Sequence, residues 1–163
     1  MGIGGSLHTI FEWRGQYNRM LRWHRRVCEY PATEPSSAEA DEYLDFVLAL
    51  FLNCYSLRDW LDKSRAATRT ELAALFKSNP DLRICRDICT GAKHFEIDDP
   101  SVDSKPSIVR NVIPDPYFGR SAYPGKRLII YAGDYERDVR ALATSCVDVW
   151  RLFLVSKGLI DAA

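Results

Sequence analysis

The chain has 163 residues, the size of one domain, and 47% of them are hydrophobic, which is enough to fill a single core. Lys plus Arg equal Asp plus Glu at 22 each. This balance excludes a field of the whole molecule that would draw it onto nucleic acid or anionic lipid, so any such binding must come from a local patch.

The N-terminus shows no secretory signal, and the longest apolar run, 46–52, is far shorter than the roughly 18 residues of a membrane span. We therefore expect a cytoplasmic protein that does not enter a membrane. The cysteines are odd in number and lie in apolar periodic segments, so we interpret them as small core residues, without disulfides, a metal site or a cofactor. They are Cys28, Cys54, Cys85, Cys89 and Cys146.

Apolar residues recur near helical spacing over 7–29 and predict a first long helix, preceded by a Gly-rich flexible tail at 1–6. The middle of this helix is the most basic window of the chain. It is either a phosphate-facing strip, with Trp23 as a stacking surface for an unpaired base, or a solvated face whose arginines pair with neighbouring acids. The candidate RNA-binding residues here are Arg22, Arg25 and Arg26.

After a Pro- and Ser-containing loop, a second helix is predicted from Ser36 or Ser37 to about Lys63. It is apolar nearly all round, which is typical of the central helix of a bundle. Three interior polar residues, Asn53, Ser56 and Asp59, step along one side of it. They could face the polar side of a later helix as supporting residues. Alternatively, the first two satisfy backbone groups and Asp59 pairs with Arg58 or another surface cation.

A short helix over 69–76 and a break at Ser78-Asn79-Pro80 lead into an amphipathic helix over 80–95. Its apolar residues share one arc, and its polar residues share an opposite arc. That polar arc combines guanidiniums, an ammonium, a carboxylate, a hydroxyl and an imidazole, which are the groups that a phosphate site requires. Its members are Arg83, Arg86, Asp87, Thr90, Lys93 and His94.

Two β-branched runs, 107–113 and 127–132, predict a two-stranded β-hairpin insertion at 107–132 with a long loop at 114–125. Gly133-Asp134 is predicted to cap the last helix, which ends near Gly158. The expected fold is mainly α. It is one domain, 1–163, a bundle of four to five helices with the hairpin before the last helix.

Metal-independent cleavage of RNA needs a group that transfers protons and cations that offset charge on the phosphate. His94 could transfer the proton, because imidazole titrates near neutral pH. Arg86 could hold the phosphate through its fork of donors, and Arg83 or Lys93 could add charge. Asp87 or Thr90 could orient the imidazole ring.

The chain resembles a group of uncharacterised bacterial helical proteins and, more distantly, the HEPN superfamily. The residues that carry the resemblance are Leu57-Arg58-Asp59-Trp60-Leu61, the stretch from Arg86 to His94, the strand pair, and Cys146-Val147-Asp148-Val149-Trp150 in the last helix. The resemblance implies a helical bundle and a metal-independent endoribonuclease of a toxin–antitoxin or phage-defence system. It further implies a homodimer whose paired Arg and His motifs meet in a shared cleft.

Carried over to this chain, the motif arginine is Arg86, the polar residue after it is Asp87, and the histidine is His94. The usual motif has fewer residues between Arg and His than the seven found here. Some HEPN-like proteins are inactive binding or assembly modules, and the departure fits one of those as well.

Three hypotheses follow. The first is a dimeric, metal-independent endoribonuclease with an RNA substrate and a possible antitoxin partner. The second is a noncatalytic module that binds RNA, a nucleotide or a partner protein through the same arc. In the third, Arg83, Arg86 and His94 only make internal ion pairs, to Asp59 or to the acids of 96–103.

Overall fold

The computed structural model describes residues 12–30, 37–94, 97–112 and 126–162. This part of the chain forms five helices and one three-stranded sheet, which confirms the mainly α class with strands inserted before the last helix. The tail at 1–6 and the loop at 114–125 lie outside the described residues. In chain order the elements are α2 (Trp13–Glu29), α3 (Ser37–Lys63), α4 (Arg69–Ser78), α5 (Pro80–Lys93), β1 (Ser107–Val112), β2 (Lys126–Ala132), β3 (Tyr135–Asp138) and α6 (Val139–Ser156).

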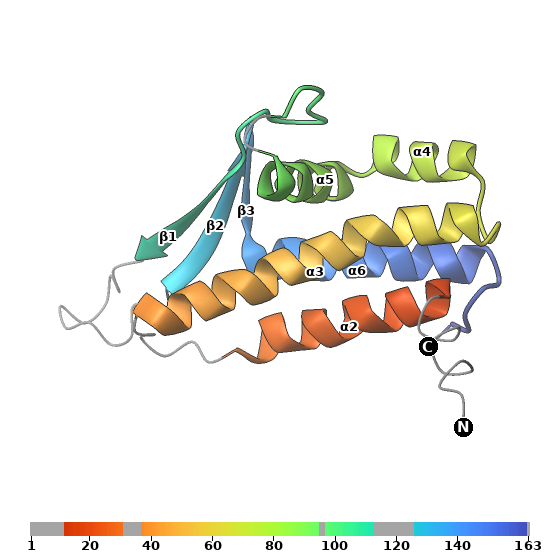
Figure 1. Ribbon diagram of the computed structural model, residues 1–163, viewed down its shortest axis with the longest axis horizontal. Coiled ribbons are helices and arrows are strands. Elements are labelled where there is room, and N and C mark those ends of the chain that lie inside the picture. Colours follow the sequence, from red (N-terminus) through yellow and green to blue (C-terminus); the bar gives the residue numbers. More distant parts are fainter. Residues whose placement is uncertain (1–11, 31–36, 95–96, 113–125, 163) are drawn as a thin grey trace.

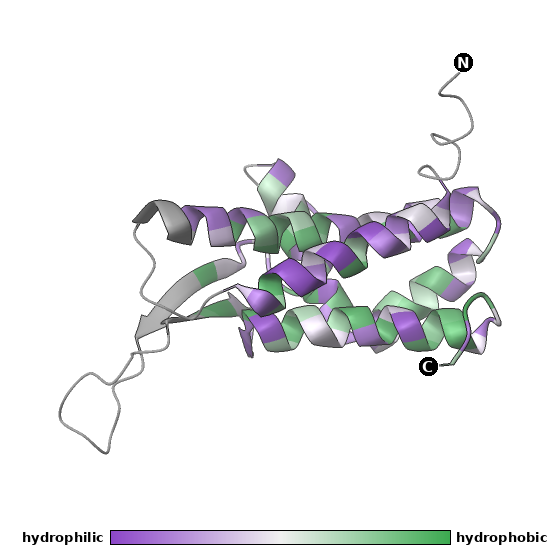
Figure 2. Ribbon diagram, turned by 90° about the horizontal axis from the view of Figure 1, so that it is seen from below, coloured by the Kyte–Doolittle hydropathy of each residue, from purple (hydrophilic) through white to green (hydrophobic). Residues whose placement is uncertain are grey.

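Helix α3 is the centre of the bundle, as its nearly continuous apolar sequence predicts. It packs against α2, α4, α5 and α6, and its residues Phe51, Cys54 and Leu57 are fully buried. In Figure 1, α3 and α6 lie between α5 above and α2 below. Figure 2, seen from below, shows α2 as a largely hydrophilic ribbon crossing in front of α3 and α6. The two helices with candidate phosphate-binding residues, α2 and α5, therefore lie on opposite sides of the core.

Helices α4 and α5 follow the local signals in the sequence. Thr68 and Glu71 form a reciprocal capping box at the start of α4, and Pro80 occupies the first turn of α5. Helix α5 ends at Lys93, before the predicted end at Phe95. His94 is its C-cap residue and has an extended backbone, although its N–H still donates to Thr90 O at 2.9 Å.

The sheet has the order β1-β2-β3 and is antiparallel throughout. Strand β3 corrects our prediction, which placed these residues at the start of the last helix. Ala132 pairs with Tyr135, so Gly133 and Asp134 make a two-residue hairpin turn, and Gly133 takes the positive φ of 55° that such turns require. Helix α6 begins at Val139.

The N-cap of α6 is Asp138, not Asp134. Its carboxylate accepts hydrogen bonds from Arg140 N at 2.9 Å and from Ala141 N at 3.0 Å. We expect Asp138→Ala to lower the free energy of unfolding by about 1 kcal/mol, because two helix N–H groups lose their acceptor. Urea titration measures this change. Asp134→Ala is the matched control and is expected to have little effect; equal losses in both variants would contradict this assignment.

Glu71 connects α4 to the end of α6. The Lys157 ammonium, 2.6 Å from Glu71 Oε1, and the backbone and hydroxyl of Thr68 lower the pKa of this carboxyl to about 2. A depressed carboxyl pKa stabilises the fold above the unfolded value of 4.5 and loses that contribution as pH falls through about 2.

We therefore expect the stability difference between the wild type and Glu71→Gln to be largest near neutral pH and to shrink steadily toward pH 2. Chemical unfolding at a series of pH values measures it. A difference that stays constant over this range would contradict the role given to the Glu71 carboxylate.

Candidate functional site

We predicted that Asp87 lies on an exposed polar arc of α5. This prediction is wrong, because Asp87 is fully buried. Its carboxylate accepts three backbone hydrogen bonds, from Ser101 N at 2.8 Å, Val102 N at 2.6 Å and Asp103 N at 3.0 Å. We call this arrangement the Asp87 clamp. The segment 97–106 covers this flank of α5, which explains the difference. Asp87 is thus buried under this segment, whereas His94 is exposed, and no hydrogen bond joins their side chains in the described part of the chain.

Arg86 is largely engaged with the same segment. Its Nη1 donates to Ser101 Oγ at 2.6 Å, and its Nη2 donates to Asp99 O at 2.8 Å and to Asp99 Oδ2 at 3.3 Å. The Arg86 side chain is 30% exposed, whereas that of Asp99 is 95% exposed. This pairing with an acid of 96–103 is the one that the structural hypothesis expects. Part of the guanidinium remains accessible to a ligand.

Two further residues of the predicted arc do not face solvent freely. Thr90 Oγ1 donates to Arg86 O at 2.9 Å, one turn back along α5. Arg83 is half-buried, and its Nε is enclosed without a hydrogen-bond partner among the described residues. Neither side chain is therefore presented to a ligand as the helical projection suggests.

Lys93 and His94, at the C-terminal end of α5, are the exposed members of the arc. Within the described part of the chain, their side chains make no hydrogen bond or ion pair. Beside Gly91 and Ala92 lies a hollow of about 320 Å³, and Lys105 contributes to its rim. Its floor is mainly apolar and includes Leu48, Ile88, Ile97 and Ile108.

Sequence analysis missed this hollow and the position of Lys105. The stretch after α5 contains acidic residues and prolines, and these indicate only that the helix stops. Ile97 was the available signal, since a single apolar residue in such a stretch often packs back onto the core. It is 7% exposed.

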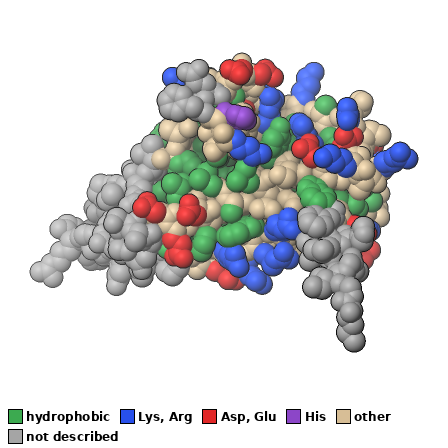
Figure 3. Space-filling model, in the orientation of Figure 1, with side chains coloured by type: hydrophobic (Ala, Val, Ile, Leu, Met, Phe, Trp, Pro, Cys, Tyr) green, Lys and Arg blue, Asp and Glu red, His purple; other side chains and the backbone are tan. Residues whose placement is uncertain are grey.

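All three candidates on the basic strip of α2 are exposed, and the side chains of Arg22 and Arg25 have no hydrogen-bond or ion-pair partner among the described residues. Arg26 lies over the Trp23 ring, with its guanidinium carbon 4.5 Å from the ring centroid. Trp23 is half-buried and packs against Phe46, with centroids 5.7 Å apart. The ring therefore has neighbours and is not an open stacking platform. In Figure 3, Lys and Arg side chains are spread over the visible face and do not form one patch.

The supporting residues predicted on α3 turn toward α2, not toward α5. Asn53 Oδ1 accepts from Gln16 Nε2 at 3.1 Å, and Asn53 Nδ2 donates to Ala49 O at 2.7 Å. Ser56 and Asp59 line a hollow together with Glu12 of the α2 N-terminus. The side of α3 on which these three residues lie is therefore not the side that packs against α5, so they do not support Arg86 or His94.

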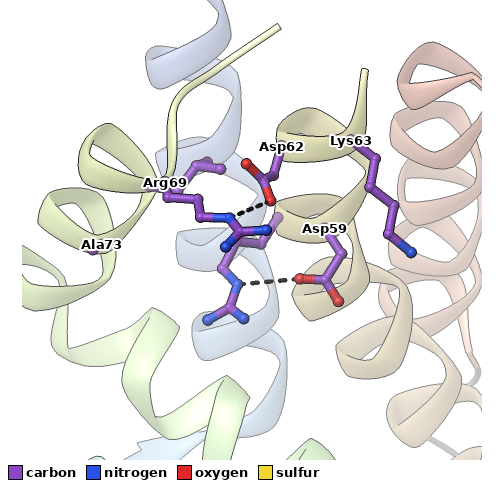
Figure 4. Close-up of a pocket in the computed structure, with 7 residues that line it drawn as sticks. Asp59, Asp62, Lys63, Arg69 and Ala73 are labelled. Atoms are coloured by element: carbon purple, nitrogen blue, oxygen red, sulfur yellow. Dashed lines mark hydrogen bonds and ion pairs between the residues drawn. The ribbon is translucent and has the colours of Figure 1, made fainter. Parts of the chain in front are cut away.

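A third hollow, of about 480 Å³, lies between α3 and α4 and is lined largely by charged residues. Figure 4 shows Arg69 of α4 directed at Asp62 of α3, with Lys63 pointing away from that pair. The Arg69 Nε to Asp62 Oδ2 distance is 2.9 Å, and Arg58 Nε lies 3.4 Å from Asp59 Oδ1. Both arginines thus have carboxylate partners, and most of the charged residues that line this hollow are paired with one another.

No protein-family model, curated protein or solved structure matches this chain. Among the described helices, none combines the length and the apolar content needed to cross a membrane.

The Asp87 clamp predicts a large difference between Asp87 on α5 and Asp99 in the 97–106 segment. We expect Asp87→Ala to lower the free energy of unfolding by about 3 kcal/mol, because three partly buried N–H groups lose their acceptor. Asp99→Ala, which removes only an exposed ion pair, is the control and should cost less than about 1 kcal/mol. Urea unfolding of both variants measures the difference. Similar losses would show that Asp87 is not the anchor.

Proposed function

We propose that the chain is a HEPN-like helical module of the cytoplasm that binds RNA at the C-terminal end of α5 without cleaving it. The observation that supports this most strongly is the exposure of Lys93 and His94, which directly follow Gly91 and Ala92 in the chain; those two residues line a hollow that Lys105 also lines. By contrast, the carboxylate of Asp87 is fully occupied by the fold. Of the three expected catalytic residues, His94 is the one whose side chain makes no hydrogen bond or ion pair with the described residues.

The chemistry of this end of α5 suits an unpaired nucleotide. Lys93 and Lys105 supply ammonium groups, which attract phosphates as point charges. The apolar floor that includes Ile88 and Ile97 could accept the face of a base, since single-stranded RNA offers unstacked bases to apolar and aromatic surfaces. Because the net charge of the chain is zero, this attraction is local and sensitive to salt.

We expect a fluorescent single-stranded RNA to bind with an affinity that falls as salt rises. Lys93→Ala should weaken binding and reduce the slope of log K against log salt by about 0.7, the value for one lost phosphate contact on a single strand. Fluorescence anisotropy over a salt series measures both quantities. Lys77→Ala, which removes an exposed lysine of α4 that is not among the candidate RNA-binding residues, is the control and should leave both unchanged. Equal effects of the two variants, or no RNA binding, would contradict this proposal.

A second candidate function is a metal-independent endoribonuclease of the toxin or phage-defence type, acting as a homodimer and held in check by an antitoxin. Two observations favour it. The His94 imidazole is exposed directly after α5, and Arg86 on that helix keeps 30% of its side chain accessible. In a two-fold dimer, His94 would transfer the proton and Arg86 would hold the phosphate, with the same groups of the second copy facing them.

Cleavage of RNA in the presence of a chelator separates the two candidates. For the nuclease we expect His94→Ala to abolish new RNA ends while leaving the melting temperature unchanged, because the side chain is exposed and makes no hydrogen bond or ion pair with the described residues. Lys77→Ala on α4 is the control. Undiminished cleavage by His94→Ala would reject the nuclease mechanism, and absence of cleavage by the wild type would leave the binding function alone.

A further inference from the structure

Three cysteine side chains from three helices meet in the core of the bundle. Cys54 of α3, Cys85 of α5 and Cys146 of α6 are buried, and their Sγ atoms all lie within 4.8 Å of one another. All three are free thiols. We call this group the trithiol cluster. Sequence analysis assigned each cysteine to the core separately, and nothing in their spacing along the chain indicates that they converge.

Two thiols of the trithiol cluster also make long, weak hydrogen bonds to backbone carbonyl groups. Cys85 Sγ donates to Phe51 O and Cys146 Sγ donates to Asp81 O, each over 3.5 Å. Hydrogen bonds from Cys146 and Cys85 lower the pKa of Cys54, whereas burial raises the pKa of Cys85.

An enclosed donor also lies at the cluster. The indole Nε1 of Trp150 is buried without a hydrogen-bond partner among the described atoms. Its N–H is nevertheless near the Cys54 sulfur and contributes to lowering the pKa of that thiol. A sulfur carrying more negative charge, such as one bonded to a metal or metalloid, would be a better acceptor for this N–H.

Charge decides which ion would suit the site. Three thiolates leave a net charge of −1 around a divalent ion and −2 around a monovalent one, but none around a trivalent centre. Uncompensated charge in an apolar core is costly. The buried polar residues of the described chain are Gln16 and Asp87, and neither supplies a cation. The nearby His24 is no substitute, because burial lowers its pKa and keeps it neutral at neutral pH.

We propose that the trithiol cluster is a binding site for a trivalent metalloid, with arsenous acid as the representative ligand. Each of the three S–H groups gives its proton to one hydroxide of As(OH)₃. Three As–O bonds break, three As–S bonds form and three water molecules leave. Arsenic stays trivalent, so no oxidant or reductant is needed, and the product buried in the core is neutral.

The distances are close to those of such a site. With bonds of about 2.3 Å from sulfur to the central atom, three sulfurs lie at most about 4 Å apart. The cluster, with separations up to 4.8 Å, would have to contract by under about 1 Å. Cys89, the remaining buried cysteine, is outside the group of three and does not complete a tetrahedral set.

Refolding the full-length reduced chain with and without sodium arsenite tests the proposal and removes the question of access to a closed core. We expect one arsenic per chain by intact mass spectrometry and a higher melting temperature than that of the arsenic-free protein. Alkylation of the native adduct should modify the exposed Cys28, and subsequent unfolding in arsenite should make Cys89 the only further thiol to react, with Cys54, Cys85 and Cys146 spared.

Cys146→Ala should weaken arsenic binding on the order of 100-fold, because a three-armed chelate becomes two-armed. Cys89→Ala is the matched control, since it removes a buried thiol from the same core and should leave binding unchanged. The wild-type alkylation pattern decides the matter even if Cys146→Ala fails to fold. Absence of an adduct, protection of a different set of cysteines, or equal weakening by both substitutions would overturn the proposal.

Discussion

The hydrogen bonds that Asp87 accepts from three consecutive backbone N–H groups fix the relation between the helical bundle and the sheet. A carboxylate can be buried at low cost only when its oxygens accept hydrogen bonds, and the backbone N–H groups of residues 101–103 donate them. Asp103 continues the connection, because its Oδ2 accepts from Gly133 N at 2.8 Å in the β2–β3 turn. The backbone N–H groups of Gly133 and Lys105 lower the pKa of Asp103, which keeps it ionised.

A second aspartate completes the attachment at the other end of α5. Asp81, in the first turn, accepts from Arg137 of β3 at 3.3 Å and from Ser145 of α6 at 2.5 Å. Helix α5 is thus tied to the sheet and to α6 by carboxylates at its start and near its middle. Its C-terminal end carries no such tie among the described residues, and there Lys93 and His94 reach solvent.

This arrangement limits what the stretch from Arg86 to His94 could do. Asp87 and much of Arg86 hold the 97–106 segment, so their identities are explained by the fold without reference to RNA. What remains for a ligand is the free end of α5 and the hollow beside it. For this reason we rank RNA binding above RNA cleavage, and we assign the decisive role in either function to residues that do not support the fold.

The sequence predicted the helices well, because a continuous apolar surface at helical spacing specifies α3 and α5 irrespective of their partners. Prediction from the sequence failed where the position of a residue depends on another segment that packs against it. Asp87 looked exposed because its neighbours on α5 are polar, and the three N–H groups that bury it belong to an irregular segment with no periodic signal. Tyr135 fitted the helical spacing of α6, but the two-residue turn before it forms a hairpin. The trithiol cluster depends on how three helices pack, which no single stretch encodes.

Amide hydrogen exchange at Ser101, Val102 and Asp103 tests the Asp87 clamp most directly. Irregular segments at a protein surface usually exchange fast, whereas amides bonded to a buried carboxylate exchange only when the structure opens. We expect these three amides to be protected by at least about 100-fold relative to an unstructured peptide, and to lose that protection together in Asp87→Ala. Exchange at the unstructured rate in the wild type would show that Asp87 does not hold this segment, and the account of the site built on it would fail.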